Sequence, residues 1–382
     1  MQALDTLEAA MLHQSPIAEE YTGASAGEVL ERIARRKAEL AGDLCILGHH
    51  YQRDEVFRFA DFTGDSLKLS RQAAASDARY IVFCGVHFMA ESADILTGGR
   101  RTVILPELSA GCPMADMADA DDLAEALEVL QAAAGEARIL PVTYVNSSAE
   151  AKALTGRAGG ACCTSGNACS VFRWALRPTA EGGGGADKLL AVPDQHLGRN
   201  TAVAIGHTLG DCAVYDPRQE RGGLSERQVR EATFLLWKGH CHVHQRFTVE
   251  QVRHVRRERA DIRVIVHPEC PHEVVAEADD AGSTEQILRA VADSPAGSAW
   301  AVGTEHNMVH RLAASHPDKS IRILSDTPAL CQTMGRIDPA HLLWALDELA
   351  AGRIVNRVEV APDVAAAARI AVERMVSIGE QH

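Results

Sequence analysis

Short apolar runs rich in β-branched residues alternate along this chain with longer segments in which apolar residues recur every three or four positions. The short runs predict buried β-strands, and the longer, alanine-rich segments predict helices that pack on them. Strands are expected at residues 44–51, 79–86, 102–108, 137–146, 160–165, 188–194, 233–239, 263–269, 299–305 and 320–326. Helices are expected at residues 54–62, 65–75, 87–96, 121–134, 147–156, 272–279 and 338–352. This alternation is typical of parallel sheets, so the predicted fold class is α/β, with either one large sheet or several small ones.

Several of the predicted strands end on polar side chains. These side chains are His49 and Tyr51, Tyr144 and Asn146, Asp194 and His196, His267 and Glu269, and Glu305 and His306. Each of them, taken alone, is explained by a helix cap or by a hydrogen-bonded core histidine. Ligands collect at the carboxyl ends of parallel strands, because loop amides and helix N-termini converge there. So many polar endings in one chain therefore favour a binding site.

Three predicted helix starts have the character of an anion site. They are TGDSLKL with Asp65 or Ser66 as the cap, CCTSGNA with Ser165, and DAGST with Ser283 and Thr284. Free backbone amides and the positive end of the helix dipole favour a phosphate or a carboxylate at such places. The alternative is capping alone, as in the segment SSAE, where Ser147 and Glu150 fit a capping box. None of the three matches a Walker loop or a dinucleotide fingerprint, which favours a small phosphorylated substrate over ATP or NAD.

Composition narrows the class of protein. A chain of 382 residues, 46% hydrophobic and 24% charged, is long enough for two or three domains. Its formal net charge of −14 argues against a nucleic-acid partner, which would need a dense cationic face. The first residues carry acids and lack a continuous apolar core, and no stretch is apolar enough to span a membrane. We therefore expect a cytoplasmic protein with no membrane partner.

The ten cysteines raise the sharpest chemical question. Cytoplasmic thiols stay mostly reduced, and the sequence has no C-x-x-C pair of the kind found in zinc ribbons or thioredoxin-like sites. Cys112, Cys241 and Cys331 lie in predicted strand-to-helix loops, whereas Cys45 and Cys84 fall inside predicted strands. One hypothesis is that the three loop thiolates converge on one soft metal centre.

Two other classes of protein fit the same residues. A zinc-dependent lyase or hydrolase would use His244, His267 and Glu269 and would keep the cysteines structural. A non-catalytic iron–sulfur protein would bind a cluster but would have no use for three anion sites. Iron, sulfide and zinc analysis distinguishes the zinc enzyme from a protein with an iron–sulfur cluster. A turnover assay distinguishes a non-catalytic iron–sulfur protein from an enzyme.

Motifs spread over residues 35–350 resemble those of the quinolinate synthase family and follow the order of that family. They are GHHYQRDEVFRFADFTGDSL, CGVHFMAESADIL, PELSAGCPMADM, PVTYVNSSAEAKA, CCTSGNA, PDQHLGRNTA, GHCHVHQRF, VHPECPHEVVAEADDAGST, VGTEHNMVHRL and CQTMGRIDPAHLLWALDEL. The resemblance implies three pseudo-symmetric α/β/α domains with small parallel sheets around a central cavity. The implied parts are an N-terminal extension at 1–34, domains at 35–116, 117–244 and 245–333 with one cluster cysteine each, and C-terminal helices at 334–382.

The resemblance also implies a cofactor and a reaction. The positions that match the cluster ligands of the family are Cys112, Cys241 and Cys331, which implies a 4Fe-4S cluster with three cysteine ligands. An iron without a cysteine ligand would act as a Lewis acid. The implied reaction condenses iminoaspartate with dihydroxyacetone phosphate to quinolinate, phosphate and water in NAD biosynthesis. L-aspartate oxidase is the implied supplier of iminoaspartate.

The matching motifs further imply which residues form the site. The implied substrate-binding residues are His49, Ser66, Tyr144, Asn146, Ser165, His267, Glu269, Ser283 and Thr284. The implied acid and base groups are Tyr51, His244, His267 and Glu269. Ser325 and Pro328 stand where some members of the family carry further cysteines, so a disulfide switch is not expected there. The glycine-rich segments 181–188 and 219–226 lie outside the motifs and are expected to be surface loops.

Overall fold

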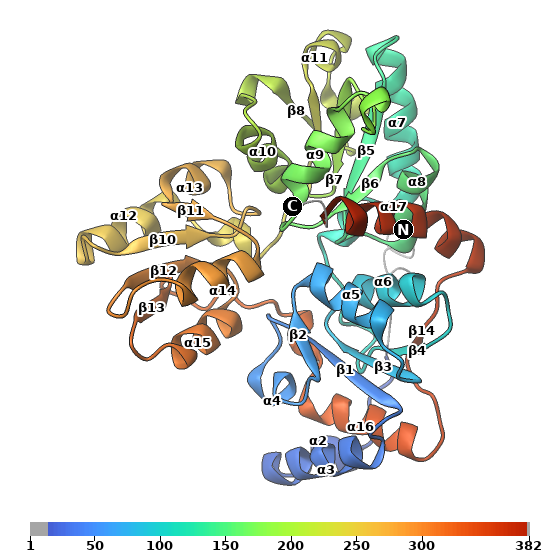
Figure 1. Ribbon diagram of the computed structural model, residues 1–382, viewed down its shortest axis with the longest axis vertical. Helices are drawn as coiled ribbons and strands as arrows, with labels where there is room; N and C mark the ends of the chain where they lie inside the picture. The colour runs from blue at the N-terminus through green and yellow to red at the C-terminus, as the bar shows by residue number, and fades with distance from the viewer. Residues whose placement is uncertain (1–13, 380–382) are drawn as a thin grey trace, which may run out of the picture. The chain divides into compact units, whose positions relative to one another are not determined.

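The computed structural model of the chain describes residues 14–379, whose helices and strands are drawn in Figure 1. These residues divide into two compact units. The first unit holds the chain up to Cys112 together with Leu330–Val360. The second unit holds Pro113–Ala329 and the chain from Ala361 onward. Each unit is therefore assembled from two separate stretches of the sequence.

The first unit is built on a five-stranded sheet in the order β14-β4-β3-β1-β2. Its strands are β1 (Leu44–His49), β2 (Phe62–Gly64), β3 (Tyr80–Cys84), β4 (Thr102–Ile104) and β14 (Arg357–Val358). Neighbouring strands are parallel, except that β14 runs antiparallel to β4. Its helices are α2 (Glu19–Thr22), α3 (Ala26–Glu39), α4 (Asp54–Phe57), α5 (Ser66–Ala75), α6 (His87–Thr97) and α16 (Pro339–Ala350). Leu47, Val82 and Phe83 are fully buried, so the central strands form the core of this unit.

The second unit contains two sheets, the larger in the order β6-β5-β7-β9-β8. Its strands are β5 (Ile139–Tyr144), β6 (Ala161–Cys163), β7 (Lys188–Val192), β8 (Cys212–Tyr215) and β9 (Phe234–Trp237), and all pairs are parallel. The accompanying helices are α7 (Ala120–Ala134), α8 (Ala149–Arg157), α9 (Ala168–Leu176), α10 (Gln195–Ala204), α11 (Glu226–Glu231) and α17 (Pro362–Gly379). Trp237 and Leu235 are fully buried and pack with Leu130 of α7, which closes one face of this sheet.

The smaller sheet of the second unit has the order β11-β10-β12-β13. Its strands are β10 (Arg263–Val266), β11 (Asp280–Ala281), β12 (Ala299–Gly303) and β13 (Ser320–Ile323), again all parallel. Its helices are α12 (Val249–Glu258), α13 (His272–Glu277), α14 (Thr284–Ala292) and α15 (His306–Ser315). Parallel strands place all their carboxyl ends at one edge of a sheet, and the polar residues that follow β10 and β12 lie there.

The predicted α/β fold class is confirmed, and all ten predicted strands are present. The periodicity left the number of sheets open, and in the described part of the chain the strands form three small sheets. The strands β2, β8, β11 and β14 were not predicted: each lies at the edge of its sheet and has at most one buried residue, so the pattern of buried apolar positions is weak there. The boundaries of the three expected domains stay a prediction. Within residues 14–379, no helix has both the length and the apolar character needed to cross a bilayer.

Two local predictions were wrong. The helix expected at 54–62 is only the short α4, which ends at Phe57. The helix α8 is capped by Ser148, whose hydroxyl accepts the Ala151 N–H at 3.1 Å, and not by a capping box of Ser147 and Glu150. Both errors concern helix ends, where several neighbouring polar residues are equally suitable caps.

Candidate active site

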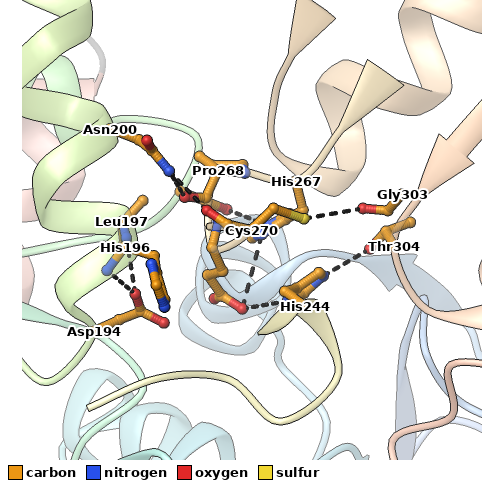
Figure 2. Close-up of polar contacts among 12 residues, drawn as sticks. Asp194, His196, Leu197, Asn200, His244, His267, Pro268, Cys270, Gly303 and Thr304 are labelled. Atoms are coloured by element: carbon orange, nitrogen blue, oxygen red, sulfur yellow. Dashed lines mark hydrogen bonds and ion pairs between the residues drawn. The ribbon is translucent and has the colours of Figure 1, made fainter. Parts of the chain in front are cut away.

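A cluster of buried polar side chains lies at the carboxyl ends of strands in the second unit, and Figure 2 shows most of it. Tyr144 is the last residue of β5, and His267 directly follows β10, with Glu269 two residues later. His244 begins the short 3-10 helix η5 (His244–Arg246) after β9, and Thr304 directly follows β12. His244, His267 and Glu269 expose only 1%, 3% and 3% of their surfaces. Their hydrogen bonds to protein groups therefore replace those to water.

His244 is held between a carboxylate and a hydroxyl (Figure 2). Its Nδ1 lies 2.5 Å from Oε2 of Glu269, and its Nε2 lies 3.0 Å from Oγ1 of Thr304. The imidazole of His267 stacks on that of His244 with 4.3 Å between the ring centroids. Because both ring nitrogens of His244 are engaged, the ring plane is fixed, and a proton can be exchanged along the line from Thr304 to Glu269.

Burial and hydrogen bonding set the charges in this cluster. Burial opposes the ionisation of Glu269, but the neighbouring His267 and His244 and the hydrogen bonds from His244 and Tyr144 outweigh it. The pKa of Glu269 therefore lies well below its usual value, and the side chain is a carboxylate at neutral pH. Burial lowers the pKa of His267 to about 3, and the neighbouring His244 adds to the shift. His267 is therefore a neutral imidazole.

The tautomer of His267 follows from its hydrogen bonds. Its Nδ1 accepts the backbone N–H of Glu269 at 3.3 Å, so the proton of the neutral ring is on Nε2. This Nε2–H donates to Oγ of Ser165 at 3.1 Å. The segment from His267 to Glu269 therefore carries the Glu269 carboxylate at one end and, at the other, the imidazole that is hydrogen-bonded to the Ser165 hydroxyl.

Two of the three predicted anion sites lie together in the second unit. Ser165 precedes α9, and Ser283 caps α14, where it forms a capping box with Gln286. A Cβ atom at Gly166 would lie 3.4 Å from Oγ of Ser283, so the two helix starts approach each other closely. The Oγ1 atom of Thr284 is buried and has no hydrogen-bond partner among the described residues. This side of the cluster therefore has unused donor capacity beside a helix N-terminus, as an anion site requires.

Asn146 lies in the turn that follows β5. Its Oδ1 and the Oγ of Ser147 are both buried and without a hydrogen-bond partner in the part of the chain that the structure describes. The turn is closed by a bond from the Ser147 N–H to the Val145 carbonyl at 2.9 Å. Buried polar atoms of this kind are costly unless a ligand or water satisfies them, and the assignment of Asn146 to substrate binding stays a prediction.

The predicted residues His49, Tyr51 and Ser66 lie in the first unit. His49 ends β1, and its Nδ1 accepts the backbone N–H of Tyr51 at 3.1 Å. The two rings meet edge to face with 4.8 Å between their centroids. Ser66 is the first residue of α5, whose cap is Asp65 through a hydrogen bond from the Lys68 N–H. His49 is buried and Tyr51 is half-buried.

The environments of the ten cysteines separate structural residues from candidate ligands. Cys84 and Cys162 are fully buried, and burial raises the pKa of each thiol to about 12. Such thiols stay protonated and pack as small apolar groups. Cys112, Cys241 and Cys331 are partly exposed and lie on loops outside helices and strands. Soft thiol donors on accessible loops have the chemistry that an iron–sulfur cluster requires of its ligands.

One of these cysteines is beside the acid–base cluster. The ligand atoms of Cys241, His244 and Glu269 all lie within 4.8 Å of one another. The zinc alternative predicted a site made of His244, His267 and Glu269, and the described residues instead group a thiol with His244 and Glu269. The assignment of individual ligands stays a prediction, whereas the proximity of Cys241 to the acid–base groups is a property of the fold.

Two strand ends turned out to have capping roles. Oδ1 of Asp194 accepts the N–H groups of His196 and Leu197 at 2.7 and 2.8 Å and so caps α10. Glu305 caps α15 by accepting the Met308 N–H at 3.2 Å. Polar residues at strand ends therefore include both members of the buried cluster and helix caps, which the sequence alone does not separate.

Thr304 was not predicted from the sequence as a member of the site. It lies in the motif GTE, where the acidic residue that follows it drew attention as a possible ligand. Thr304 is fully buried, and its hydroxyl contacts a histidine sixty residues earlier in the chain. A threonine after a strand is common, so only the polar residues Glu305 and His306 that follow it could have pointed to it.

Comparison with known proteins finds a matching family model and many similar sequences. The family model described as Quinolinate synthetase A protein matches residues 31–377. A quinolinate synthase of Nocardioides sp. is 52% identical over 94% of this chain and 92% of its own length. The enzyme of the same name from Streptomyces coelicolor is 51% identical over 92% and 88%, and that from Anoxybacillus flavithermus is 49% identical over 96% and 98%.

Proposed function

This chain belongs to the quinolinate synthetase A family, and from that premise we propose that it condenses iminoaspartate with dihydroxyacetone phosphate to quinolinate, phosphate and water. The observation that carries the proposal is the buried cluster in which Glu269, His244 and Thr304 are hydrogen-bonded in line beside Cys241. The reaction joins two small molecules, closes a ring and expels water, and so needs repeated proton transfers in a site shielded from solvent. A chain of buried acid and base groups suits that need.

Substrate binding in this proposal uses both charge and hydrogen bonds. Ser165, Ser283 and Thr284 offer hydroxyls at helix starts, where the free amides of α9 and α14 favour the phosphate of the triose. Ser66 offers a further hydroxyl at the start of α5. Asn146 has a buried carbonyl oxygen that a substrate amine or imine N–H would satisfy.

Proton transfer in this proposal is divided among four residues. Glu269 is the carboxylate that accepts a proton, and His244 passes protons between it and the substrate side. His267 is neutral, and its Nε2–H donates to the Ser165 hydroxyl. That hydroxyl can in turn donate a hydrogen bond to a negative charge that develops on the substrate. Tyr51 serves as an acid or base at the carbon atoms of the new ring, and Tyr144 supports Glu269. His49 orients Tyr51 and faces the substrate.

Cys112, Cys241 and Cys331 would hold the 4Fe-4S cluster in this proposal. When bound, the cluster supplies a Lewis acid through the iron that lacks a cysteine ligand. The protein contributes thiols on accessible loops, which can deprotonate on metal binding, while the buried thiols stay protonated. We further propose that the protein works in the cytoplasm as a transferase of NAD biosynthesis, supplied with iminoaspartate by L-aspartate oxidase.

Anaerobic purification with iron, sulfide, zinc and quinolinate analysis tests the proposal. We expect iron and sulfide in a cluster stoichiometry, and quinolinate formed only when both substrates are present. Cys112→Ala, Cys241→Ala and Cys331→Ala should each lose the cluster and turnover. Cys84→Ala is the matched control, because this thiol is buried in β3, and it should keep both. Zinc in place of iron, or a full cluster in any of the three loop variants, would contradict the assignment.

A further inference from the structure

Two side chains of the first unit join the loop after Cys331 to the segment that follows Tyr51. The Nε2 amide of Gln52 donates to the carbonyl oxygen of Met334 at 3.3 Å. The guanidinium of Arg53 donates to the carbonyl oxygen of Gly335. These two carbonyls are three and four residues beyond Cys331, so both bonds end on the loop that carries the proposed ligand.

The other end of this connection is fixed to Tyr51 with little freedom. The Gln52 N–H donates to the His49 carbonyl at 3.0 Å, and the Tyr51 N–H donates to His49 Nδ1 at 3.1 Å. Oε1 of Gln52 accepts the Arg53 N–H at 2.9 Å, so both ends of this buried amide are engaged. The backbone on each side of Tyr51 is therefore held, by His49 before it and by Gln52 and Arg53 after it.

The Cys331 loop is itself fixed to the loop of the other cysteine in this unit. The Gly335 N–H donates to the Cys331 carbonyl at 3.0 Å. Arg336 Nη1 donates to the carbonyl of Ser109, three residues before Cys112, at 3.0 Å. The loops of Cys112 and Cys331 thus form one connected piece, and Gln52 and Arg53 bind to that piece.

An ionic bridge strengthens the same connection. His341 of α16 lies with Nε2 3.1 Å from Oε2 of Glu107 and with Nδ1 2.9 Å from Oδ1 of Asp338. Oε1 of Glu107 also accepts the N–H and the hydroxyl of Ser109 at 2.7 and 2.6 Å. The segment before Cys112 and the segment after Cys331 are therefore tied at two separate points.

We propose that Gln52 and Arg53 are positioning residues, which hold Tyr51 against the Cys331 loop so that a metal centre bound at Cys331 fixes the place of the phenol. This inference rests on the proposed function, because it takes Tyr51 as an acid or base and Cys331 as a ligand. Binding of a cluster restrains the Cys331 loop, and the bonds to the Met334 and Gly335 carbonyls transmit the restraint to the Tyr51 segment. The phenol would then be held more tightly when the cluster is in place.

The functional test is a set of variants with a double-mutant cycle. Arg53→Met removes the bond to the Gly335 carbonyl, and Gln52→Leu removes that to the Met334 carbonyl. The matched control is Arg101→Met, since Arg101 is on the same unit and pairs only with the fully exposed Asp77 in the described part of the chain. Arg53→Met should keep its iron and lose turnover by about 10–100-fold, the range expected for a misplaced reacting group.

The cycle separates positioning from a merely structural role. In a Tyr51→Phe background, Arg53→Met should cause no further loss of turnover, because the group that it positions is already gone. A loss of the same size in both backgrounds would overturn the inference. Gln52→Leu provides a second variant if Arg53→Met fails to fold, and the same two outcomes apply to it.

Hydrogen exchange tests the connection between Tyr51 and the Cys331 loop without an enzyme assay. We expect hydrogen exchange of the amides at 49–57 to slow when iron and sulfide are loaded into wild type and into Arg101→Met, but not into Arg53→Met. Equal exchange in Arg53→Met and Arg101→Met would overturn the inference even if wild type makes quinolinate. If wild type forms a cluster but no quinolinate, the proposed function fails, and the exchange comparison alone decides on the connection.

Discussion

Acidification should weaken the second unit through His267, because burial keeps this imidazole neutral in the native protein. The native pKa of His267 is about 3, whereas an unfolded histidine has a pKa of about 6.5. Below pH 6.5 the unfolded chain therefore binds a proton that the native protein does not bind. Stability falls as the pH falls, and the loss continues until the pH reaches about 3.

The size of the effect follows from these two values. Between pH 7 and pH 5 the unfolded histidine becomes almost fully protonated, while the native His267 stays neutral. Linkage then gives a loss of about 2 kcal/mol in the free energy of unfolding from this one side chain. The variant His267→Asn should lack this contribution, since asparagine does not titrate and its Oδ1 can still accept the Glu269 N–H that His267 Nδ1 accepts now.

Urea unfolding at pH 7 and pH 5, followed by tryptophan fluorescence, measures the difference. Trp174, Trp237 and Trp300 all lie in the second unit, so the signal reports mainly the unit that contains His267. The control is His254→Asn, which removes a half-buried histidine from α12 of the same unit and shows whether the loss of any histidine of this unit has the same effect. If wild type and His267→Asn lose equal stability between the two pH values, the argument from burial is refuted.

Three further changes test other parts of the site. Tyr51→Phe should keep the cluster and product binding but lose at least about 100-fold in turnover, the scale of a missing acid or base; near-normal turnover would contradict its role. Ser165→Ala should weaken binding of dihydroxyacetone phosphate by about 1–3 kcal/mol, measured from the apparent affinity, and unchanged affinity would reassign Ser165 to support of its helix start. Gly239→Ala should reduce iron per chain, because its Cβ would lie 2.3 Å from the Pro193 carbonyl oxygen and so displace the Cys241 loop; full iron content would show that the loop adapts.

The sequence predicted most strands well because they are continuous apolar runs that become buried, whereas β13 has no buried residue. Residues 80–84 and 139–144 are examples, and every residue in both strands is buried. The short β11 and β14 could not be predicted, since two residues pair with a neighbouring strand only when the tertiary fold brings them there. The number of sheets is likewise a property of packing and not of the local period.

The site was predictable to the extent that its residues stand in strand-end motifs. His267 and Glu269 follow a strand directly, and the structure brings both into the buried cluster. Thr304 and Gln52 were not predicted, because each acts through a partner far along the chain, at His244 and Met334 respectively. Such pairings depend on how loops meet, and one sequence does not contain that information.

The two-segment construction of each unit has a consequence for how the protein is made. The first unit lacks α16 and β14 until residues 330–360 have been synthesised. Until then β4 has no β14 to pair with, although residues 113–329 of the second unit have already been made. The second unit is likewise incomplete until α17 has been synthesised. The Met375 carbonyl of α17 accepts a hydrogen bond from the side-chain amide of Asn167, near Ser165. Neither unit can be completed during translation before nearly all the chain exists. Production of the isolated units would therefore require co-expression of the missing segments, as in fragment complementation.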